Sequence, residues 1–369
     1  MKYYLIAGEA SGDLHGSNLL REIASIDSEA SFRGFGGDKM ATQGMDIIIH
    51  YKKIAFMGFK EVILNLFTFM KAFRVVKQDI LKFKPDVLIL IDYPGFNLRM
   101  AKFAKQHGLK VIYYISPQLW AWKEGRINAI RQYVDKMICI LPFEKDYYAK
   151  WNYKVDYVGH PLMETIEIHK PAPDFIRKNS LNEKPIIAIL PGSRKQEIQK
   201  ILPVLVSVQK EFPAYQFVVA ATSNFSSGFY KTSAGTEDIK LVFDETYDLL
   251  SHAQAGLITS GTATLETALF GIPLIVCYST TSFTYYISKS FIKINYISLV
   301  NLILDKPAIK ELIQHELTAE NITKELRKIL EDDRYRDEML KNLANLKALL
   351  GEEKASSKAA EIIYRFISQ

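Results

Sequence analysis

Residues 3–16, YYLIAGEASGDLHG, combine an apolar run with a glycine-rich turn. Five apolar residues, Tyr3–Ala7, are followed at once by a glycine-rich turn and then by a helical pattern over Asp13–Ile26. An uninterrupted apolar run bounded by turn residues is typical of a strand that is buried on both faces. The stretch therefore predicts a strand, a tight turn and a helix, which is the repeating unit of parallel α/β sheets.

The same unit recurs in both halves of the chain. Further apolar strand patterns lie at Val87–Ile91, Val111–Ile115, Lys136–Leu141, Ile186–Leu190, Gln216–Ala221, Leu257–Thr259 and Leu274–Tyr278. Because helical patterns separate these runs, we expect an α/β protein with two Rossmann-like, doubly wound domains that face a central cleft.

A proline-containing stretch of mixed charge separates the two halves. Pro171 and Pro173 interrupt the alternation, so we expect a linker over residues 166–184. Residues 1–165 and 185–345 then form one domain each, and residues 346–369 form a helical tail. The tail could pack on its own N-terminal domain or on that of a partner, which leaves a homodimer open.

The composition narrows the class of protein. Of the 369 residues, 48% are hydrophobic and 24% charged, which is typical of globular domains and excludes disorder and coiled coils. The net charge of +6 suits phosphates or an anionic membrane surface and is too small to indicate nucleic-acid binding. The two cysteines, Cys139 and Cys277, cannot form a disulfide framework, so we expect a reducing, cytoplasmic compartment.

Two turns in the second half are candidates for binding an anion. Leu190 is followed by the turn residues Pro191, Gly192, Ser193 and Arg194, and a helical pattern begins there. Backbone N–H groups at such a helix start can meet a phosphate, and the Arg194 guanidinium can add a two-pronged charged contact. The alternative is an ordinary strand–helix turn with a surface arginine.

The second turn comes directly after the Leu257–Thr259 run. Ser260, Gly261 and Thr262 offer small side chains and free amides at a helix start, and Glu266 follows one helical turn later, where it could accept from ribose hydroxyls. The alternative is that Ser260 and Thr262 only cap the helix. Two turns in one domain that can each bind an anion favour a nucleoside diphosphate as the ligand.

Other phosphate and metal motifs are missing from the sequence. There is no Gly-x-x-x-x-Gly-Lys-Ser/Thr loop, which counts against a P-loop ATPase. Gly8, Gly12 and Gly16 do not have the spacing of a dinucleotide fingerprint. Without an Asp-x-Asp pair or a histidine cluster, we expect a metal-free mechanism in which cations and helix ends balance the phosphate charge.

In the first half, two turns carry candidate polar groups. One is Gly8–Asp13, and the other follows the Val87–Ile91 strand and places Asp92 before Pro94. Asp92 is a candidate general base, with capping of the next helix as an equally weighted alternative. His15 is a rival base, although a single histidine on a helix more often has a structural role.

An unusual apolar and basic segment covers Phe56–Val76. Many of its residues are aromatic or aliphatic, and every charged residue after Glu61 is basic. This composition is typical of a helix that lies on an anionic lipid surface, while a core helix is the competing interpretation.

A set of motifs, taken together in chain order, resembles the lipid-A-disaccharide synthase family. Singly these motifs are weak, but the ordered set is specific and covers residues 8 to about 314. They are Gly8–Asp13, Ser116–Trp122, Pro142–Glu144, Gly159–Leu162, Leu190–Arg194 and Ser260–Glu266.

The resemblance implies an inverting, metal-independent GT-B glycosyltransferase of family 19 with no cofactor. Such an enzyme joins UDP-2,3-diacylglucosamine to 2,3-diacylglucosamine 1-phosphate (lipid X), forming a β-1,6-linked disaccharide and UDP. It is a peripheral protein on the cytoplasmic face of the inner membrane. Residues 1–165 would then serve the acceptor and the membrane, and residues 185–345 would bind the UDP-sugar.

The resemblance also suggests roles for single residues. Asp92 would be the base, and Asn301 matches a family motif near the donor. The expected donor-side residues are Gly192, Ser193, Arg194, Ser260, Gly261, Thr262, Glu266 and Asn301, and the expected acceptor-side residues are Glu9, Ser11, Gly12 and Asp13.

Two positions depart from the family pattern. Many members have a second aspartate where Gly95 stands and a proline where Val300 stands. Two other functions stay open: another UDP-sugar enzyme, such as a 2-epimerase or a peptidoglycan GlcNAc transferase, and a non-catalytic module that binds a UDP-sugar or lipid.

Overall fold

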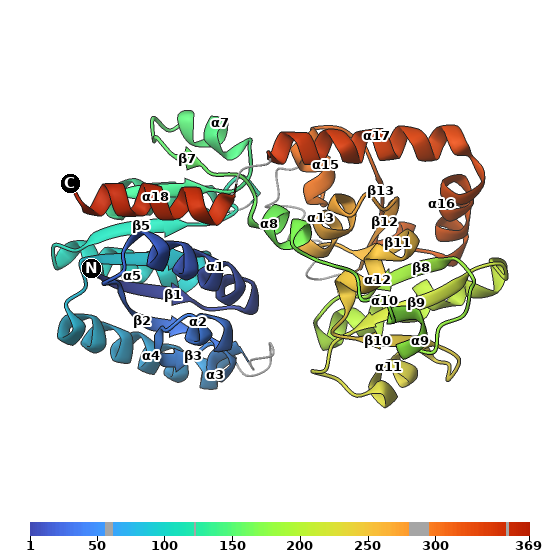
Figure 1. Cartoon of the computed structure of the whole chain (residues 1–369), viewed down its shortest axis with the longest axis horizontal. Helices are drawn as coiled ribbons and strands as arrows, with labels where there is room; N and C mark the ends of the chain where they lie inside the picture. The colour runs from blue at the N-terminus through green and yellow to red at the C-terminus, as the bar shows by residue number, and fades with distance from the viewer. Residues whose placement is uncertain (56–61, 122, 280–294, 352–353) are drawn as a thin grey trace. The chain divides into compact units, whose positions relative to one another are not determined.

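The chain forms two compact α/β units (Figure 1). The computed structural model describes residues 1–55, 62–121, 123–279, 295–351 and 354–369. Met1–Pro161 and Glu352–Gln369 form the first unit, and Leu162–Gly351 form the second.

The first unit contains a seven-stranded sheet in the order β3-β2-β1-β4-β5-β6-β7, and all its pairs are parallel. Its strands are β1 (Lys2–Ala7), β2 (Ser31–Gly36), β3 (Asp46–His50), β4 (Val87–Ile91), β5 (Lys110–Tyr114), β6 (Lys136–Cys139) and β7 (Asp156–Tyr157). Its helices are α1 (Ala10–Ile26), α2 (Asp38–Thr42), α3 (Lys52–Ala55), α4 (Val62–Phe83), α5 (Pro94–Gln106), α6 (Ile127–Tyr133), α7 (Glu144–Ala149) and α18 (Ala355–Ile367).

The second unit contains a six-stranded parallel sheet in the order β10-β9-β8-β11-β12-β13. Its strands are β8 (Ile186–Leu190), β9 (Gln216–Ala221), β10 (Lys240–Phe243), β11 (Ala253–Thr259), β12 (Leu274–Tyr278) and β13 (Lys310–Ile313). Its helices are α9 (Phe175–Lys178), α10 (Lys195–Ser207), α11 (Ser227–Ala234), α12 (Thr246–Ser251), α13 (Thr262–Leu269), α15 (Leu299–Leu304), α16 (Ala319–Glu331) and α17 (Asp333–Leu350), and α8 (Pro161–Glu167) joins the two units.

Each sheet has one point where the strand order reverses. In the first sheet this point lies between β1 and β4, where Ala7 pairs with Ile91. In the second it lies between β8 and β11, where Leu190 is level with Ile258. Ligands of open α/β sheets bind beyond the carboxyl ends of the strands at such a point. All four turns selected from the sequence as candidate sites follow these four strands.

The C-terminal helix α18 returns to the first unit and packs against α1 and β5 (Figure 1). The Lys110 ammonium donates to the carbonyls of Phe366 and Ile367, both at 3.2 Å, which satisfies acceptors at the end of the helix. Of the expected tail over 346–369, the residues up to Leu350 instead continue α17 in the second unit.

The stretch expected as a linker packs on the second unit. The division falls after Pro161, four residues earlier than expected, and residues 166–184 contain α9. The Ala172 amide donates to Asp248 at 2.6 Å, and the Phe175 ring stacks on His252. These contacts order a stretch whose prolines suggested a simple connection.

Part of the expected lipid-facing segment, residues 56–61, lies outside the described residues. From Thr68 onward α4 has two sides. Phe69 and Phe73 pack edge-on against Phe96, whereas the Met70 side chain is 51% exposed. Within the described ranges, we find no helix with the length and apolarity needed to cross a bilayer.

Candidate functional site

The turn after β4 holds Asp92 in an unusual backbone conformation. Asp92 and Tyr93 have φ angles of 44° and 46°, in the left-handed region that side chains other than glycine seldom adopt. Helix α5 is capped at Tyr93 without a side-chain hydrogen bond, so capping does not explain Asp92. The Asp92 side chain is half-buried at the point where the strand order reverses.

The surroundings of Asp92 favour its protonated form. Burial, and next the negative charge of Glu9, raise the pKa of the Asp92 carboxyl to about 6, against a smaller opposing contribution from the Tyr93 backbone N–H. A carboxylate with such a pKa is ionised at pH 7 and is a stronger proton acceptor than an ordinary aspartate. Asp92 is therefore the described acidic group of the first unit that best suits a general base.

Close approach of the β1 and β4 turns requires Gly8. A Cβ atom at this position would lie 2.3 Å from the Tyr93 ring, so only glycine leaves room for the tyrosine. Glu9 and Ser11 are exposed at the start of α1, and no side chain caps the helix at Glu9. The negative charge of Glu9 acts on the Asp92 carboxyl across this approach.

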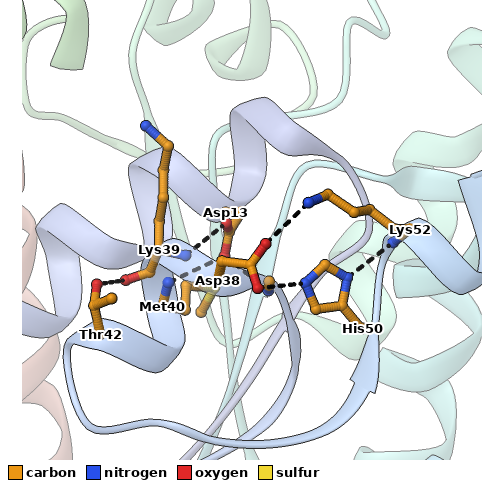
Figure 2. Close-up of polar contacts among 8 residues, drawn as sticks. Asp13, Asp38, Lys39, Met40, Thr42, His50 and Lys52 are labelled. Atoms are coloured by element: carbon orange, nitrogen blue, oxygen red, sulfur yellow. Dashed lines mark hydrogen bonds and ion pairs between the residues drawn. The ribbon is translucent and has the colours of Figure 1, made fainter. Parts of the chain in front are cut away.

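The other two expected acceptor-side residues, Gly12 and Asp13, lie inside the unit. A Cβ atom on Gly12 would come within 3.3 Å of the Ala7 Cβ. The buried Asp13 carboxylate accepts from the amides of Gly37, Lys39 and Met40 at 2.8–3.1 Å (Figure 2). Asp13 thus holds the start of α2 against α1. We assign Asp13 a structural role at the carboxyl edge of the first sheet.

His15, the rival base, is buried and uncharged at neutral pH. Burial lowers the pKa of His15 to about 4. His160, at the end of the first unit, is also buried, and desolvation and the nearby His15 lower its pKa to about 3. Burial removes both rings from direct contact with a substrate in solution, which leaves Asp92 as the stronger candidate.

Sequence reasoning did not single out the buried carboxyl of Glu144. Glu144 accepts from the amides of Ile140 and Leu141 at 3.3 and 3.0 Å, and burial raises its pKa to about 7. Phe143, next to it, packs edge-on against Trp120. No periodic pattern marks Glu144, although it belongs to one of the motifs quoted above.

In the second unit, the turn after β8 presents cationic and polar groups to solvent. Arg194 is the residue before α10, its side chain is 78% exposed, and its guanidinium donates to Glu197 at 2.9 Å. Gly192 has a φ of 101°, which glycine adopts without strain, and Ser193 is exposed. An anion could therefore reach Arg194 and the Ser193 amide.

The turn after β11 is equally open. Gly261 precedes α13 with a φ of 146° and no side chain caps the helix, so the alternative that Ser260 and Thr262 serve as caps does not apply. Gly261 and Thr262 are exposed and Ser260 is half-buried. The first amides of α13 are thus available for an anion.

Two further donor-side candidates are engaged within the unit. Tyr247 donates to Glu266 at 3.0 Å, and burial raises the pKa of this glutamate. Asn301 is buried, donates to the Ile309 carbonyl and to Glu311 at 2.9 Å, and accepts from the Ile309 amide at 3.0 Å. Both ends of the Asn301 amide are therefore used to hold its loop.

Within the described residues, no group of three or more His, Cys, Asp or Glu side chains has a metal-binding arrangement.

The sequence profile of the lipid-A-disaccharide synthetase family matches residues 3–365. A lipid-A-disaccharide synthase of Geobacter sulfurreducens is 34% identical over 99% of this chain and 97% of its own length. One from Coxiella burnetii is 36% identical over 98% of both chains.

Solved structures share the fold at low identity. S. aureus MnaA in a co-structure with UDP has a TM-score of 0.71 at 13% identity, covering 100% of this chain and 97% of its own. The UDP-GlcNAc 2-epimerase of Neisseria meningitidis bound to UDP-GlcNAc has a TM-score of 0.69 at 13% identity, covering 99% and 100%. The calicheamicin glycosyltransferase CalG4 has a TM-score of 0.64 at 12% identity, covering 100% and 98%.

These likenesses show the GT-B class of fold, with two parallel-sheet α/β domains. Because the profile matches nearly the whole chain and the relatives share more than 30% identity over almost their full lengths, the chain belongs to the lipid-A-disaccharide synthase family.

Proposed function

We propose that the protein is an inverting glycosyltransferase that condenses UDP-2,3-diacylglucosamine with 2,3-diacylglucosamine 1-phosphate (lipid X), giving lipid A disaccharide 1-phosphate and UDP. The family supports this reaction, and the observation that carries our assignment of the chemistry is Asp92, with a pKa raised to about 6 at the reversal point of the first sheet. The first unit would bind the acceptor and the second the UDP-sugar.

In this mechanism Asp92 accepts the proton of the acceptor 6-hydroxyl. The hydroxyl oxygen forms a bond to the anomeric carbon of the donor while the bond from that carbon to the diphosphate breaks, with inversion. Negative charge develops on the departing UDP. Hydrogen-bond donors and cations that are held in place around the diphosphate lower the barrier. A general base whose pKa lies near the working pH contributes roughly 10²- to 10⁴-fold to the rate.

The leaving diphosphate would be held by the open turns of the second unit. Arg194 supplies the charged fork, and the amides at Ser193, Gly261 and Thr262 supply backbone donors. Glu266 would accept from the ribose hydroxyls through the carboxylate oxygen that Tyr247 does not contact. Asn301 would support the donor site through its loop, since its amide bonds to Ile309 and Glu311.

A peripheral membrane location is part of the proposal, because both substrates carry acyl chains. The exposed Met70, together with Lys71 and Arg74 on the same helix, is the described part of the segment that would meet an anionic lipid surface. Replacing Met70 by Ser should reduce co-sedimentation with anionic liposomes. Unchanged sedimentation of this variant would remove Met70 from the docking surface.

The reaction itself is tested with purified protein, UDP-2,3-diacylglucosamine and lipid X in detergent with EDTA present, and mass spectrometry identifies the products. We expect a tetraacyl disaccharide 1-phosphate and UDP. Folded protein that binds UDP but makes no disaccharide would overturn the proposal. Turnover of non-acylated UDP-GlcNAc would then favour an epimerase or another transferase, and binding without turnover would favour a non-catalytic module.

A further inference from the structure

Two consecutive residues at the proposed base adopt a backbone conformation that costs free energy. Asp92 and Tyr93 both lie in the left-handed region, and neither is glycine. A residue with a Cβ atom is strained in this region, because the Cβ atom crowds the neighbouring backbone. Strain of this kind persists only where the surrounding contacts prevent the backbone from relaxing.

Two buried side chains donate to the same backbone carbonyl at this turn. The Asn97 Nδ2 donates to the Asp92 carbonyl at 2.7 Å and to the Ile91 carbonyl at 3.1 Å. The Tyr113 hydroxyl, from the neighbouring strand β5, donates to the Asp92 carbonyl as well. Both side chains are fully buried. The Asp92 amide in turn donates to the Tyr114 carbonyl at 3.1 Å, so the backbone of Asp92 is bound on both sides.

Residue 93 is held by packing. The Tyr93 ring lies against Gly8 and packs on Phe35 and Phe96, and Pro94 begins helix α5 directly afterwards. Neither residue of the strained pair can therefore relax without breaking contacts in the core. The backbone angles of Asp92 determine where its Cβ atom points, and hence where its carboxylate lies.

We propose that Tyr113 and Asn97 are positioning residues that hold the Asp92 carboxylate at its working place by clamping the Asp92 carbonyl. This inference rests on the proposed role of Asp92 as the base. Neither Tyr113 nor Asn97 contacts the substrate in this proposal. Both act through the backbone, and a misplacement of about 1 Å at a reacting group can lower a rate roughly 100-fold.

The decisive variant is Tyr113→Phe, which removes one donor and leaves the ring in place. The Asp92 carbonyl keeps its bond from Asn97, so no buried acceptor is left unpaired. Tyr153→Phe is the matched control. The Tyr153 hydroxyl also donates to a backbone carbonyl, that of Val134 at 2.9 Å, before the amino end of β6 and hence away from the carboxyl ends of the strands.

We expect Tyr113→Phe to lower kcat about 10- to 100-fold, with the KM of both substrates within about twofold of the unmodified protein. Tyr153→Phe should change neither quantity. In the Asp92→Asn background, Tyr113→Phe should have almost no further effect on kcat, because the clamp acts only through that carboxylate. An equal loss in both backgrounds, or an equal loss in Tyr153→Phe, would overturn the inference.

A readout that does not need turnover separates this inference from the proposed reaction. Carbon-13 NMR titration, with the Asp92→Asn protein as the reference, reports the pKa of Asp92 in each variant. We expect a value near 6 in the unmodified protein and in Tyr153→Phe, and a clearly lower one in Tyr113→Phe, where the released carboxylate reaches water. An inactive protein with this pattern would contradict the proposed reaction alone, whereas an unchanged titration in Tyr113→Phe would contradict the clamp.

Discussion

The carboxyl edges of the two sheets are built in opposite ways. In the first unit, Asp92 is half-buried and its backbone is hydrogen-bonded to buried neighbours, and Asp13 is fully engaged. In the second unit, Arg194 is largely exposed and Gly261 begins a helix without a side-chain cap. The first edge holds its polar groups in hydrogen bonds within the unit, whereas the second presents an arginine and the start of a helix at the surface.

The difference follows from what each edge would bind. A base gains strength from partial burial, which raises its pKa, and it must be held in one place before the substrate arrives. A diphosphate carries its own charge, so its site needs accessible donors that the ligand itself completes. Substitutions at the two edges should therefore have separable effects.

Asp92→Asn should abolish most of the reaction without affecting the other edge. We expect kcat to fall about 10³-fold, because the amide cannot accept the acceptor proton. The affinity for UDP, measured by calorimetry, should stay within about twofold. A comparable loss of UDP affinity would show that the two edges are not separate in function.

Arg194→Ala should act on the opposite edge. Loss of a hydrogen-bonded charge contact costs about 1.5–3 kcal/mol, so UDP should bind roughly 10- to 100-fold more weakly. Arg194→Lys is the matched variant, since it keeps the charge but loses the planar fork, and its loss should be smaller. If both variants bind UDP like the unmodified protein, Arg194 is only a surface partner of Glu197.

Gly261→Ala should weaken UDP binding by about tenfold through the backbone alone. An added Cβ atom meets nothing within 4 Å there, but the φ of 146° disfavours any residue other than glycine. Gly95→Ala, on the edge of the first unit, is the control, because an added Cβ atom there also meets nothing and φ is not in the disfavoured region. Similar effects of the two substitutions on UDP affinity would remove the role of the Gly261 turn.

Glu9→Gln should give the smallest effect, a shift in the pH profile. The ionised form of Asp92 is the active base, so kcat/KM should rise with pH through about 6. The Glu9 charge helps to raise that pKa, so its removal should move the midpoint to lower pH and leave the rate at pH 8 almost unchanged. Because Glu9 is exposed, added salt should reduce the shift. An upward shift would contradict this assignment.

Strands that are buried on both faces were the most predictable part of the fold. The patterns at Val87–Ile91, Ile186–Leu190, Gln216–Ala221 and Leu274–Tyr278 match β4, β8, β9 and β12 residue for residue. By contrast, the four edge strands β3, β7, β10 and β13 and the inner strand β2 were missed. The edge strands are short and only partly buried, and β2 contains Arg33 and two glycines, so no continuous apolar run marks any of them.

The candidate site was predictable in location but not in its internal contacts. A turn between a strand and a helix is a local pattern, and all four turns lie at the two reversal points. Whether a polar side chain is already engaged depends on distant residues. Asp13 binds amides 24 to 27 positions further along, and Tyr113 meets Asp92 only because β4 and β5 pair. No spacing rule in the sequence contains this information.

The return of α18 to the first unit has a consequence for how the protein is made. The contacts of α18 with α1 and β5 join residues on either side of the 190-residue second unit, Leu162–Gly351. At about 5–20 residues per second, a ribosome needs roughly 10–40 s to add that segment. During this interval the surfaces of α1 and β5 that later pack against α18 have no partner from that helix. The N-terminal unit, although synthesised first, would therefore complete its packing last, and a nascent chain would expose apolar surface that a chaperone can shield.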